Sequence, residues 1–223
     1  MLKNIKAVAF DIDGTLYPAS SLNIRLIPYV IKHLFFYLHY NKVRNILHRT
    51  APLPDFYEYQ ARLFARETGC TASEAKSKIS NIAYDGLKEY FKKIRPFKNV
   101  DEAFRLLKEK GYKIALLSDF PPEQKGDVWG LTSFCDCALG TEQIGALKPS
   151  KYPFGVLALS LKLKPEEILY VGNSVKYDLI GAKNAGMKTA VIACGLKKIF
   201  NKKLSQADIV FSNYRQFIDI LLK

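Results

Sequence analysis

The sequence predicts an α/β fold: a parallel sheet, interrupted after its first strand by an all-helical insert. Three observations lead to this fold class. Short apolar runs such as Ile5 to Phe10 end abruptly in polar or turn residues, which is typical of strands buried on both faces of a parallel sheet. Helical patterns separate these runs, and strand–helix–strand alternation favours right-handed crossovers. The stretch from Tyr17 to Ile94 breaks the alternation and contains helical patterns only.

The expected core elements follow one another in a regular order. After the first strand, similar runs occur at 113–118, 168–171 and 189–193, and a weaker one at 207–211. Between them, the helical pattern from Val100 to Lys110 ends at Gly111, and the pattern from Tyr177 to Ala185 ends at Gly186. Glycine is the usual residue just after a helix. We therefore expect residues 1–16 and 95–223 to form one Rossmann-like core.

The insert, residues 17–94, is expected to contain at least three helices. Its first apolar residues form one helical stripe, at positions 26, 27, 30, 31, 34, 35 and 38. A second helix from Asp55 to Thr68 ends at Gly69. Thr71 and Glu74 have the spacing of a capping box, which opens a third helix. The insert should close at Arg95-Pro96, because the residue before proline is disfavoured in helical geometry.

Composition excludes several classes of protein. The 223 residues are 48% hydrophobic and 25% charged, which is ordinary for a globular chain. Lysine and arginine outnumber aspartate and glutamate by 34 to 21, but the basic residues are scattered, so we expect an anionic small substrate and no nucleic acid. Four cysteines are too few for a disulfide scaffold. No signal peptide or membrane span is evident, so we expect a cytoplasmic protein with no membrane partner.

Polar side chains follow three of the expected strands, at the point where each strand ends. Because ligands bind at the carboxyl ends of parallel strands, these side chains should form one site. Carboxylates clustered beside a lysine are costly to bury unless a cation and an anion lie among them, and a divalent metal with a phosphate would satisfy every group. The residues are Asp11, Asp13 and Thr15 after the first strand, Ser118 and Asp119 after the strand at 113–118, and Asn173, Ser174 and Asp178 after the strand at 168–171; Lys148 joins them from the loop after the next pattern.

The same residues resemble the four motifs of the haloacid dehalogenase-like (HAD) superfamily. Residues 10–17 read FDIDGTLY, which is similar to the DxDGT motif that follows that superfamily's first strand. Ser118 resembles the second motif and Lys148 the third. The segment from Gly172 to Asp178 resembles the fourth motif, normally GDSxxxD. The motifs occur in the right order, and the insert resembles the superfamily's helical cap.

The resemblance implies a magnesium-dependent phosphomonoester hydrolase that acts on a small phosphorylated metabolite. Asp11 would be the nucleophile that forms an aspartyl-phosphate, and Asp13 would be the general acid and base. Mg²⁺ would be held by Asp11, by the backbone carbonyl of Asp13 and by Asn173 or Asp178. The implied substrate-binding residues are Gly14, Thr15, Ser118, Asp119 and Lys148.

One departure leaves two alternatives open. The fourth motif has Asn173 where the superfamily normally has aspartate, and metal-independent haloacid dehalogenases also carry asparagine there. Against a dehalogenase, those enzymes resemble DxYGT at the first motif and have a shorter spacing to the following aspartate, whereas this chain keeps Asp13. The second alternative is a protein that binds phosphorylated ligands but has lost turnover. An EF-hand calcium loop is excluded, because its twelfth position would be Leu22 instead of glutamate.

The insert carries two further features. Eight of the 13 tyrosines lie within residues 17–94. Helix packing is the favoured interpretation, and an aromatic-lined specificity pocket is the alternative. All three histidines, His33, His39 and His48, also lie there, and we interpret them as surface or packed residues.

Overall fold

Six parallel strands form the centre of the molecule. The computed structural model describes residues 4–193 and 207–223. Its strands are β1 (Ala7–Phe10), β2 (Lys113–Ser118), β3 (Cys137–Gly140), β4 (Ile168–Gly172), β5 (Lys188–Ile192) and β6 (Ile209–Phe211). The sheet order is β3-β2-β1-β4-β5-β6, and every pair is parallel. Because β1 lies between β2 and β4, the residues that follow these three strands emerge side by side.

The predicted α/β class is confirmed, and the strand missing from the prediction is β3. All four residues of β1 are completely buried, as expected for a strand covered on both faces. In β3, by contrast, three of the four residues are only half-buried. The strand lies at the sheet edge and lacks a long apolar run. The two thiols near it, Cys135 and Cys137, are free and half-buried.

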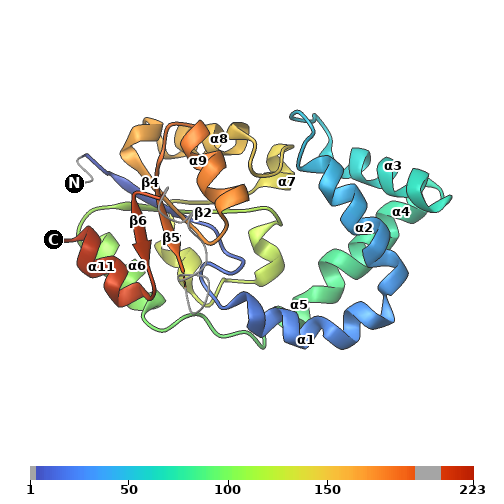
Figure 1. Cartoon of the computed structure of the whole chain (residues 1–223), viewed down its shortest axis with the longest axis horizontal. Coiled ribbons are helices and arrows are strands. Elements are labelled where there is room, and N and C mark those ends of the chain that lie inside the picture. Colours follow the sequence, from blue (N-terminus) through green and yellow to red (C-terminus); the bar gives the residue numbers. More distant parts are fainter. Residues whose placement is uncertain (1–3, 194–206) are drawn as a thin grey trace.

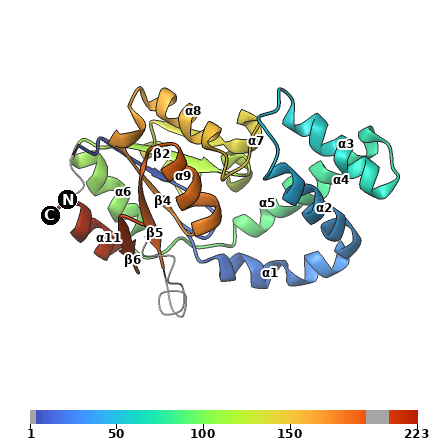
Figure 2. The same ribbon diagram turned by 45° about the horizontal axis from the view of Figure 1, so that its top comes forward.

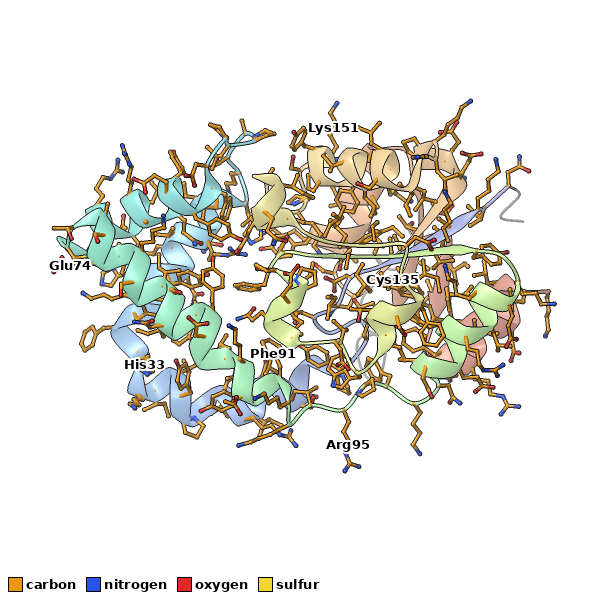
Figure 3. The ribbon with its side chains drawn as sticks, turned by 180° about the vertical axis from the view of Figure 1, so that it is seen from behind. His33, Glu74, Phe91, Arg95, Cys135 and Lys151 are labelled. Atoms are coloured by element: carbon orange, nitrogen blue, oxygen red, sulfur yellow. The ribbon has the colours of Figure 1, made fainter. Side chains whose placement is uncertain are left out.

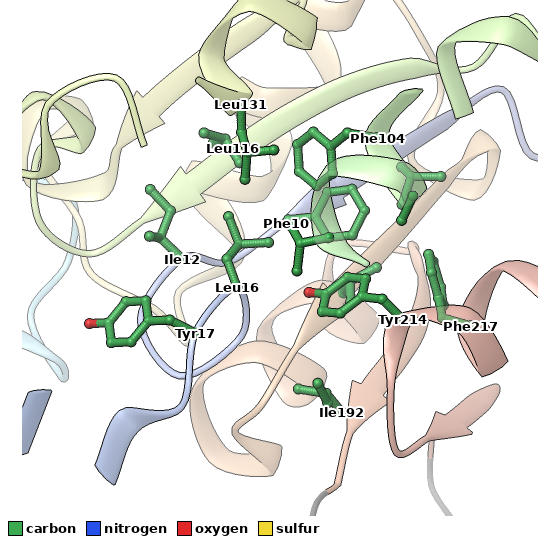
Figure 4. Packing of buried hydrophobic residues seen from close by; sticks show 14 of the residues in the cluster. Phe10, Ile12, Leu16, Tyr17, Phe104, Leu116, Leu131, Ile192, Tyr214 and Phe217 are labelled. Carbon is green, nitrogen blue, oxygen red and sulfur yellow. The ribbon is translucent and has the colours of Figure 1, made fainter. Parts of the chain in front are cut away.

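Helices cover both faces of the sheet (Figures 1 and 2). One face carries α6 (Val100–Glu109) and α11 (Tyr214–Leu221), and the other carries α8 (Lys151–Leu161) and α9 (Ile180–Asn184). The side chains of β1 alternate between the two layers. Phe10 packs on Phe104 with ring centroids 4.7 Å apart and on Phe217 at 6.1 Å (Figure 4). Ala9 faces the opposite layer. This packing fixes β1, and with it the start of the first motif.

The helices of the insert lie beyond one end of the sheet (Figure 3). They are α1 (Ala19–Lys32), α2 (Leu34–Leu47), α3 (Phe56–Thr68), α4 (Ala72–Ile79), the π-helix η1 (Ser80–Asp85) and α5 (Gly86–Phe91). Asp55 caps α3, and the predicted capping box of Thr71 and Glu74 is present. Most of these helices share a hydrophobic cluster of their own, which includes Phe36 and Phe64. The division into a core, residues 1–16 and 95–223, and a cap, residues 17–94, stays a prediction.

One prediction about the insert is wrong. The apolar stripe at positions 26–38 was expected to lie on a single helix, but the helix breaks at His33 and continues as α2. Five residues of the stripe are exposed, and Phe35 is 81% exposed. The five are Ile27, Ile31, Leu34, Phe35 and Leu38. Helical spacing shows which residues share a face, but it does not show that another element covers that face.

The two connections between insert and core lie side by side. The backbone N–H of Phe97 donates to the carbonyl of Leu16 at 2.8 Å. Trp129 lies across both connections: its indole N–H donates to the carbonyl of Ile94 at 2.8 Å, and its ring centroid is 5.5 Å from that of Tyr17. In the described part of the chain, no helix is long and apolar enough to cross a membrane.

Candidate active site

The first and third motifs meet through a buried ion pair. Lys148 Nζ lies 2.7 Å from Asp11 Oδ1 and 2.8 Å from Asp178 Oδ1. Both Asp11 and Lys148 are less than 5% exposed. Burial raises the pKa of Asp11, and the positive charge of Lys148 opposes that rise. Burial by itself lowers the pKa of Lys148, but the two carboxylates raise it well above its ordinary value. The lysine is therefore charged, and it holds the Asp11 carboxylate in place.

The Asp13 carboxylate is surrounded by donors. Tyr17 donates its hydroxyl to Oδ1 at 2.6 Å, and Ser118 donates to Oδ2 at 3.1 Å. Lys125 Nζ also lies 3.1 Å from Oδ2. The lysine side chain is completely buried, and its Nζ lies 5.0 Å from the ring centroid of Phe91. Sequence reasoning missed Lys125, which lies on the short 3₁₀-helix η2 (Pro122–Lys125) and belongs to no motif.

The hydroxyl groups of Thr15 and Ser118 bind the carboxylates of Asp11 and Asp13, and Gly14 lies between the first and fourth motifs. Thr15 donates its hydroxyl to Asp11 Oδ2 at 2.7 Å, as Ser118 does to Asp13, and both hydroxyl residues are completely buried. Gly14 has a positive φ of 84°, and a Cβ there would come within 1.9 Å of Asn173 Nδ2. Glycine therefore lets the fourth motif approach the first. Contacts of Gly14, Thr15 and Ser118 with a phosphoryl group stay predictions.

The fourth motif is shaped by the π-helix η5 (Val175–Leu179). Its wider turn carries Asp178 back over the end of β4, where Asp178 Oδ2 accepts hydrogen bonds from the backbone N–H groups of Asn173 at 3.0 Å and Ser174 at 2.9 Å. A Cβ on Gly172 would lie 2.3 Å from the Asp178 Cβ, so only glycine fits there. Both carboxylate oxygens of Asp178 thus have partners within the chain.

The oxygen atoms near Asp13 fit a hard divalent cation. The Asn173 side chain lies against the backbone carbonyl of Asp13, with its Nδ2 at 3.2 Å. Rotating that amide by 180° would exchange its nitrogen for its oxygen at the same place. With a carboxylate oxygen of Asp11, such a set consists of oxygens only, as Mg²⁺ prefers. The described residues contain no cluster of three or more acidic, histidine or cysteine side chains suited to a metal, so the fit depends on the Asp13 carbonyl and the Asn173 amide.

Asp119 lies beside this group and is ionised. Its Oδ1 accepts hydrogen bonds from the Thr141 hydroxyl at 2.8 Å and from the backbone N–H of Lys148 at 3.1 Å. Burial opposes ionisation, but Lys148 and Arg44 together lower the pKa of Asp119 below its ordinary value. Asp119 therefore ties the third motif to the loop that follows the second.

A cavity of about 760 Å³ lies above these residues. The core contributes Asp11, Asp13, Asp119, Lys148, Asn173 and Asp178 to its lining. The helix α2 contributes five residues, Tyr37, Tyr40, Asn41, Arg44 and Asn45, and its C-cap residue His48 adds a sixth. Sequence reasoning did not assign these α2 residues to the site, although they recur at helical spacing. Asp11 and Asp178 are buried and Asp119 is half-buried, so the cavity joins carboxylates of the core to a wall formed by the insert.

Arg44 on α2 and its C-cap residue His48 also tie the insert to the core. Arg44 forms a buried ion pair and hydrogen bond with Glu142 on α7 (Thr141–Ile144). His48 Nδ1 lies 2.6 Å from the carbonyl oxygen of Lys148, and its ring stacks on Tyr177 with centroids 4.5 Å apart. Burial lowers the pKa of His48. The earlier interpretation of His48 as a packed residue is thus correct, although it is packed against the candidate site.

Comparisons with known proteins agree with this geometry. A sequence model of the haloacid dehalogenase-like hydrolases matches residues 5–186. The chain is 26% identical over 220 residues to pyrophosphatase PpaX of Halalkalibacterium halodurans, covering 97% of each chain. It is 30% identical over 200 residues to glyceraldehyde 3-phosphate phosphatase of Methanopyrus kandleri, covering 86% of this chain and 85% of the other.

Solved structures share the fold as well. A HAD phosphatase from Thermococcus onnurineus superposes with a TM-score of 0.66 at 21% identity, covering 97% of this chain and 98% of the other. The match of the family model covers all four motifs and most of the chain. The chain belongs to the haloacid dehalogenase-like hydrolase family.

Proposed function

We propose that this hydrolase is a magnesium-dependent phosphatase that cleaves the phosphomonoester of a small metabolite through an aspartyl-phosphate. The observation that supports this most directly is the pair of carboxylates at the bottom of the cavity. Asp11 is bound to Lys148, and Asp13 lies two residues further along the same loop. A nucleophile and a separate acid–base group at this spacing are what a two-step phosphoryl transfer requires.

In the first step, an Asp11 carboxylate oxygen attacks phosphorus, and the bond from phosphorus to the leaving oxygen breaks. Asp13 gives its proton to that oxygen, so the product leaves as a neutral alcohol. In the second step, Asp13 removes a proton from water, the water oxygen attacks phosphorus, and the bond to Asp11 breaks to release phosphate. Lys148 offsets negative charge on Asp11 and on the phosphoryl group throughout. A bound Mg²⁺ would supply further positive charge beside the phosphoryl oxygens.

Three residues would hold that cation: Asp11, Asp13 through its carbonyl, and Asn173 through its amide oxygen. Asp178 is the alternative to Asn173: Lys148 and two backbone N–H groups bind its oxygens, as Lys148 and Thr15 bind those of Asp11. The proposed cap, residues 17–94, would open to admit substrate and close to exclude water. The relatives named as phosphatases and pyrophosphatase support phosphoryl chemistry.

The test is hydrolysis of p-nitrophenyl phosphate with and without Mg²⁺, followed by mass spectrometry of protein trapped during turnover. We expect release of phosphate that depends on Mg²⁺, and a transient phosphate on Asp11. Phosphate trapped on another residue would overturn the mechanism. Asn173 is the observation that keeps a dehalogenase as second candidate, and release of halide from a 2-haloacid without metal would favour it.

A further inference from the structure

The cavity carries more negative than positive charge. Its described lining includes four carboxyl groups, of Asp11, Asp13, Asp119 and Asp178, and two cations, Arg44 and Lys148. A third cation, Lys125, lies outside that lining and is paired with Asp13. His48 adds no charge at neutral pH, because burial lowers its pKa. A divalent cation would roughly balance this excess before substrate enters. Any anionic group on the substrate beyond its phosphate would then find no excess positive charge to offset it.

Both lining cations are already paired. Lys148 binds Asp11 and Asp178 within 2.8 Å. Arg44 is paired with Glu142, whose side chain is completely buried, and its guanidinium lies 4.7 Å above the Phe120 ring. Among the described residues that line the cavity, neither cation is left for a carboxylate or a second phosphate of a substrate.

Gln124 presents a hydrogen-bond acceptor at the same cavity. Its Nε2 donates to the carbonyls of Ala83 at 2.8 Å and Tyr84 at 3.1 Å, which fixes the orientation of the amide. The remaining atom, Oε1, is buried without a partner in the described structure, and Gln124 lines the cavity. A buried carbonyl oxygen without a donor is costly. A substrate hydroxyl can supply that donor, whereas a carboxylate or phosphate oxygen cannot.

We propose that the cavity selects monophosphates whose leaving group is neutral and carries a further hydroxyl, and that Gln124 accepts a hydrogen bond from that hydroxyl. The inference rests on the proposed phosphatase function and narrows its substrate class. Other neutral groups of the wall, the Asn41 and Asn45 amides and the Tyr37 hydroxyl, extend the same uncharged surface. Phosphorylated acids and pyrophosphate, whose leaving groups are anionic, are excluded by charge.

Two substrates of equal length test the charge argument directly. 2-Hydroxyethyl phosphate carries a hydroxymethyl group at the position where 2-phosphoglycolate carries a carboxylate. Ethyl phosphate has neither group. We expect kcat/KM to be at least tenfold higher for 2-hydroxyethyl phosphate than for 2-phosphoglycolate. It should also exceed the value for ethyl phosphate, and Gln124→Met should abolish this second difference. Equal or faster turnover of 2-phosphoglycolate or pyrophosphate would overturn the proposal.

A variant that gains activity on 2-phosphoglycolate would show that the ion pair of Arg44 with Glu142 limits the substrate class. Glu142→Gln removes the partner charge and leaves an unpaired guanidinium at the cavity wall, so kcat/KM for 2-phosphoglycolate relative to 2-hydroxyethyl phosphate should rise at least tenfold. Glu123→Gln, which removes an equal charge from an exposed neighbour of Gln124, should leave that ratio unchanged. If Glu142→Gln is folded by circular dichroism and the ratio does not rise, Arg44 pairing does not set the selectivity.

Binding separates this inference from the proposed function. Calorimetry on Asp11→Asn with Mg²⁺ measures the affinities of the two ligands without turnover. Tighter binding of 2-hydroxyethyl phosphate supports the inference about the substrate class. If the wild-type enzyme then fails to hydrolyse p-nitrophenyl phosphate, only the proposed phosphatase activity is contradicted. Tighter binding of 2-phosphoglycolate overturns the inference whatever the turnover.

Discussion

Arg44→Met should destabilise the protein far more than the loss of an ordinary ion pair. The Arg44 and Glu142 side chains are 10% and 0% exposed, and Tyr84 donates its hydroxyl to the second Glu142 oxygen at 2.8 Å. Without the guanidinium, a buried carboxylate loses its only ion-pair partner among the described residues. Breaking one side of a buried pair typically lowers the free energy of unfolding by about 3–5 kcal/mol, and we expect a loss in that range.

A second substitution separates the charge from the packing. Adding Glu142→Leu to Arg44→Met removes the stranded carboxylate, and buried pairs replaced by apolar residues are often neutral or more stable. The double variant should therefore recover most of the loss. A residual deficit of about 1 kcal/mol is expected, because the Tyr84 hydroxyl then lacks its acceptor. Arg62→Met is the matched control: its ion pair with Glu58 is exposed by 72% and 36%, and it should change stability by at most about 0.5 kcal/mol.

The loss should depend on pH in a defined direction. Burial raises the pKa of Glu142 in the folded protein, while Arg44 and the Tyr84 hydroxyl oppose the rise; without Arg44, the pKa rises further. A carboxyl group whose pKa is higher in the folded than in the unfolded state takes up protons on folding. Stability is then greatest below the unfolded pKa, and it falls as pH rises toward the folded pKa, by up to about 1.4 kcal/mol per pH unit. The deficit of Arg44→Met should be smaller at pH 5.5 than at pH 8.

Urea denaturation followed by circular dichroism at both pH values measures these quantities. The reasoning is refuted if Arg44→Met costs no more than Arg62→Met, or if the double variant is no more stable than the single one. A deficit that grows on acidification would contradict the sign of the linkage.

Three further predictions concern the site and the thiols. Asp11→Asn should lower phosphatase kcat by at least about 10³-fold while leaving the melting temperature within a few degrees, because the amide keeps the shape but is not nucleophilic; near-normal activity would exclude Asp11 as nucleophile. Asn173→Asp should lower the Mg²⁺ concentration for half-maximal activity by up to about tenfold, because an added charge near the cation favours binding. Asn173→Asp should also increase the rise in melting temperature on adding Mg²⁺, whereas Asp178→Asn should reduce both activity and stability. If the Mg²⁺ concentration for half-maximal activity is unchanged in Asn173→Asp, the metal lies elsewhere. Burial raises the pKa of Cys135 to about 12 and of Cys137 to about 11, so both thiols remain protonated at pH 8. Both should therefore react with iodoacetamide at least about 10²-fold more slowly than glutathione does. Mass spectrometry of the alkylated protein measures these rates.

The sheet edge could be predicted because its information is local. Each apolar run identifies a strand, and the residue after each run must lie at the carboxyl edge. Asp11 and Asp178 were expected together on this ground, and Lys148 through its resemblance to the third motif. Lys148 lies within 2.8 Å of both carboxylates. The strand β3 was not predicted, because it is a half-buried edge strand. Such strands lack the continuous apolar pattern of the central strands.

The contacts between insert and core could not be predicted, because no local pattern encodes them. Arg44 and Glu142 are 98 positions apart, and His48 and Lys148 are 100 apart. Lys125 looked like one of many surface lysines in a basic chain, yet its side chain is fully buried against Asp13. Only the three-dimensional approach of α2 and η2 to the sheet edge identifies these side chains as parts of the site.

The place of Trp129 gives the molecule a built-in optical reporter. It is the chain's single tryptophan, and its indole N–H binds the carbonyl of Ile94 while its ring touches Tyr17. These are the residues at which the chain leaves and re-enters the core. Any rotation of the insert about these connections must alter the hydrogen bond or the ring contact, and with them the polarity around the indole. The wavelength of tryptophan emission therefore reports on this junction, so stopped-flow fluorescence of unlabelled protein tests whether the insert opens and closes as proposed.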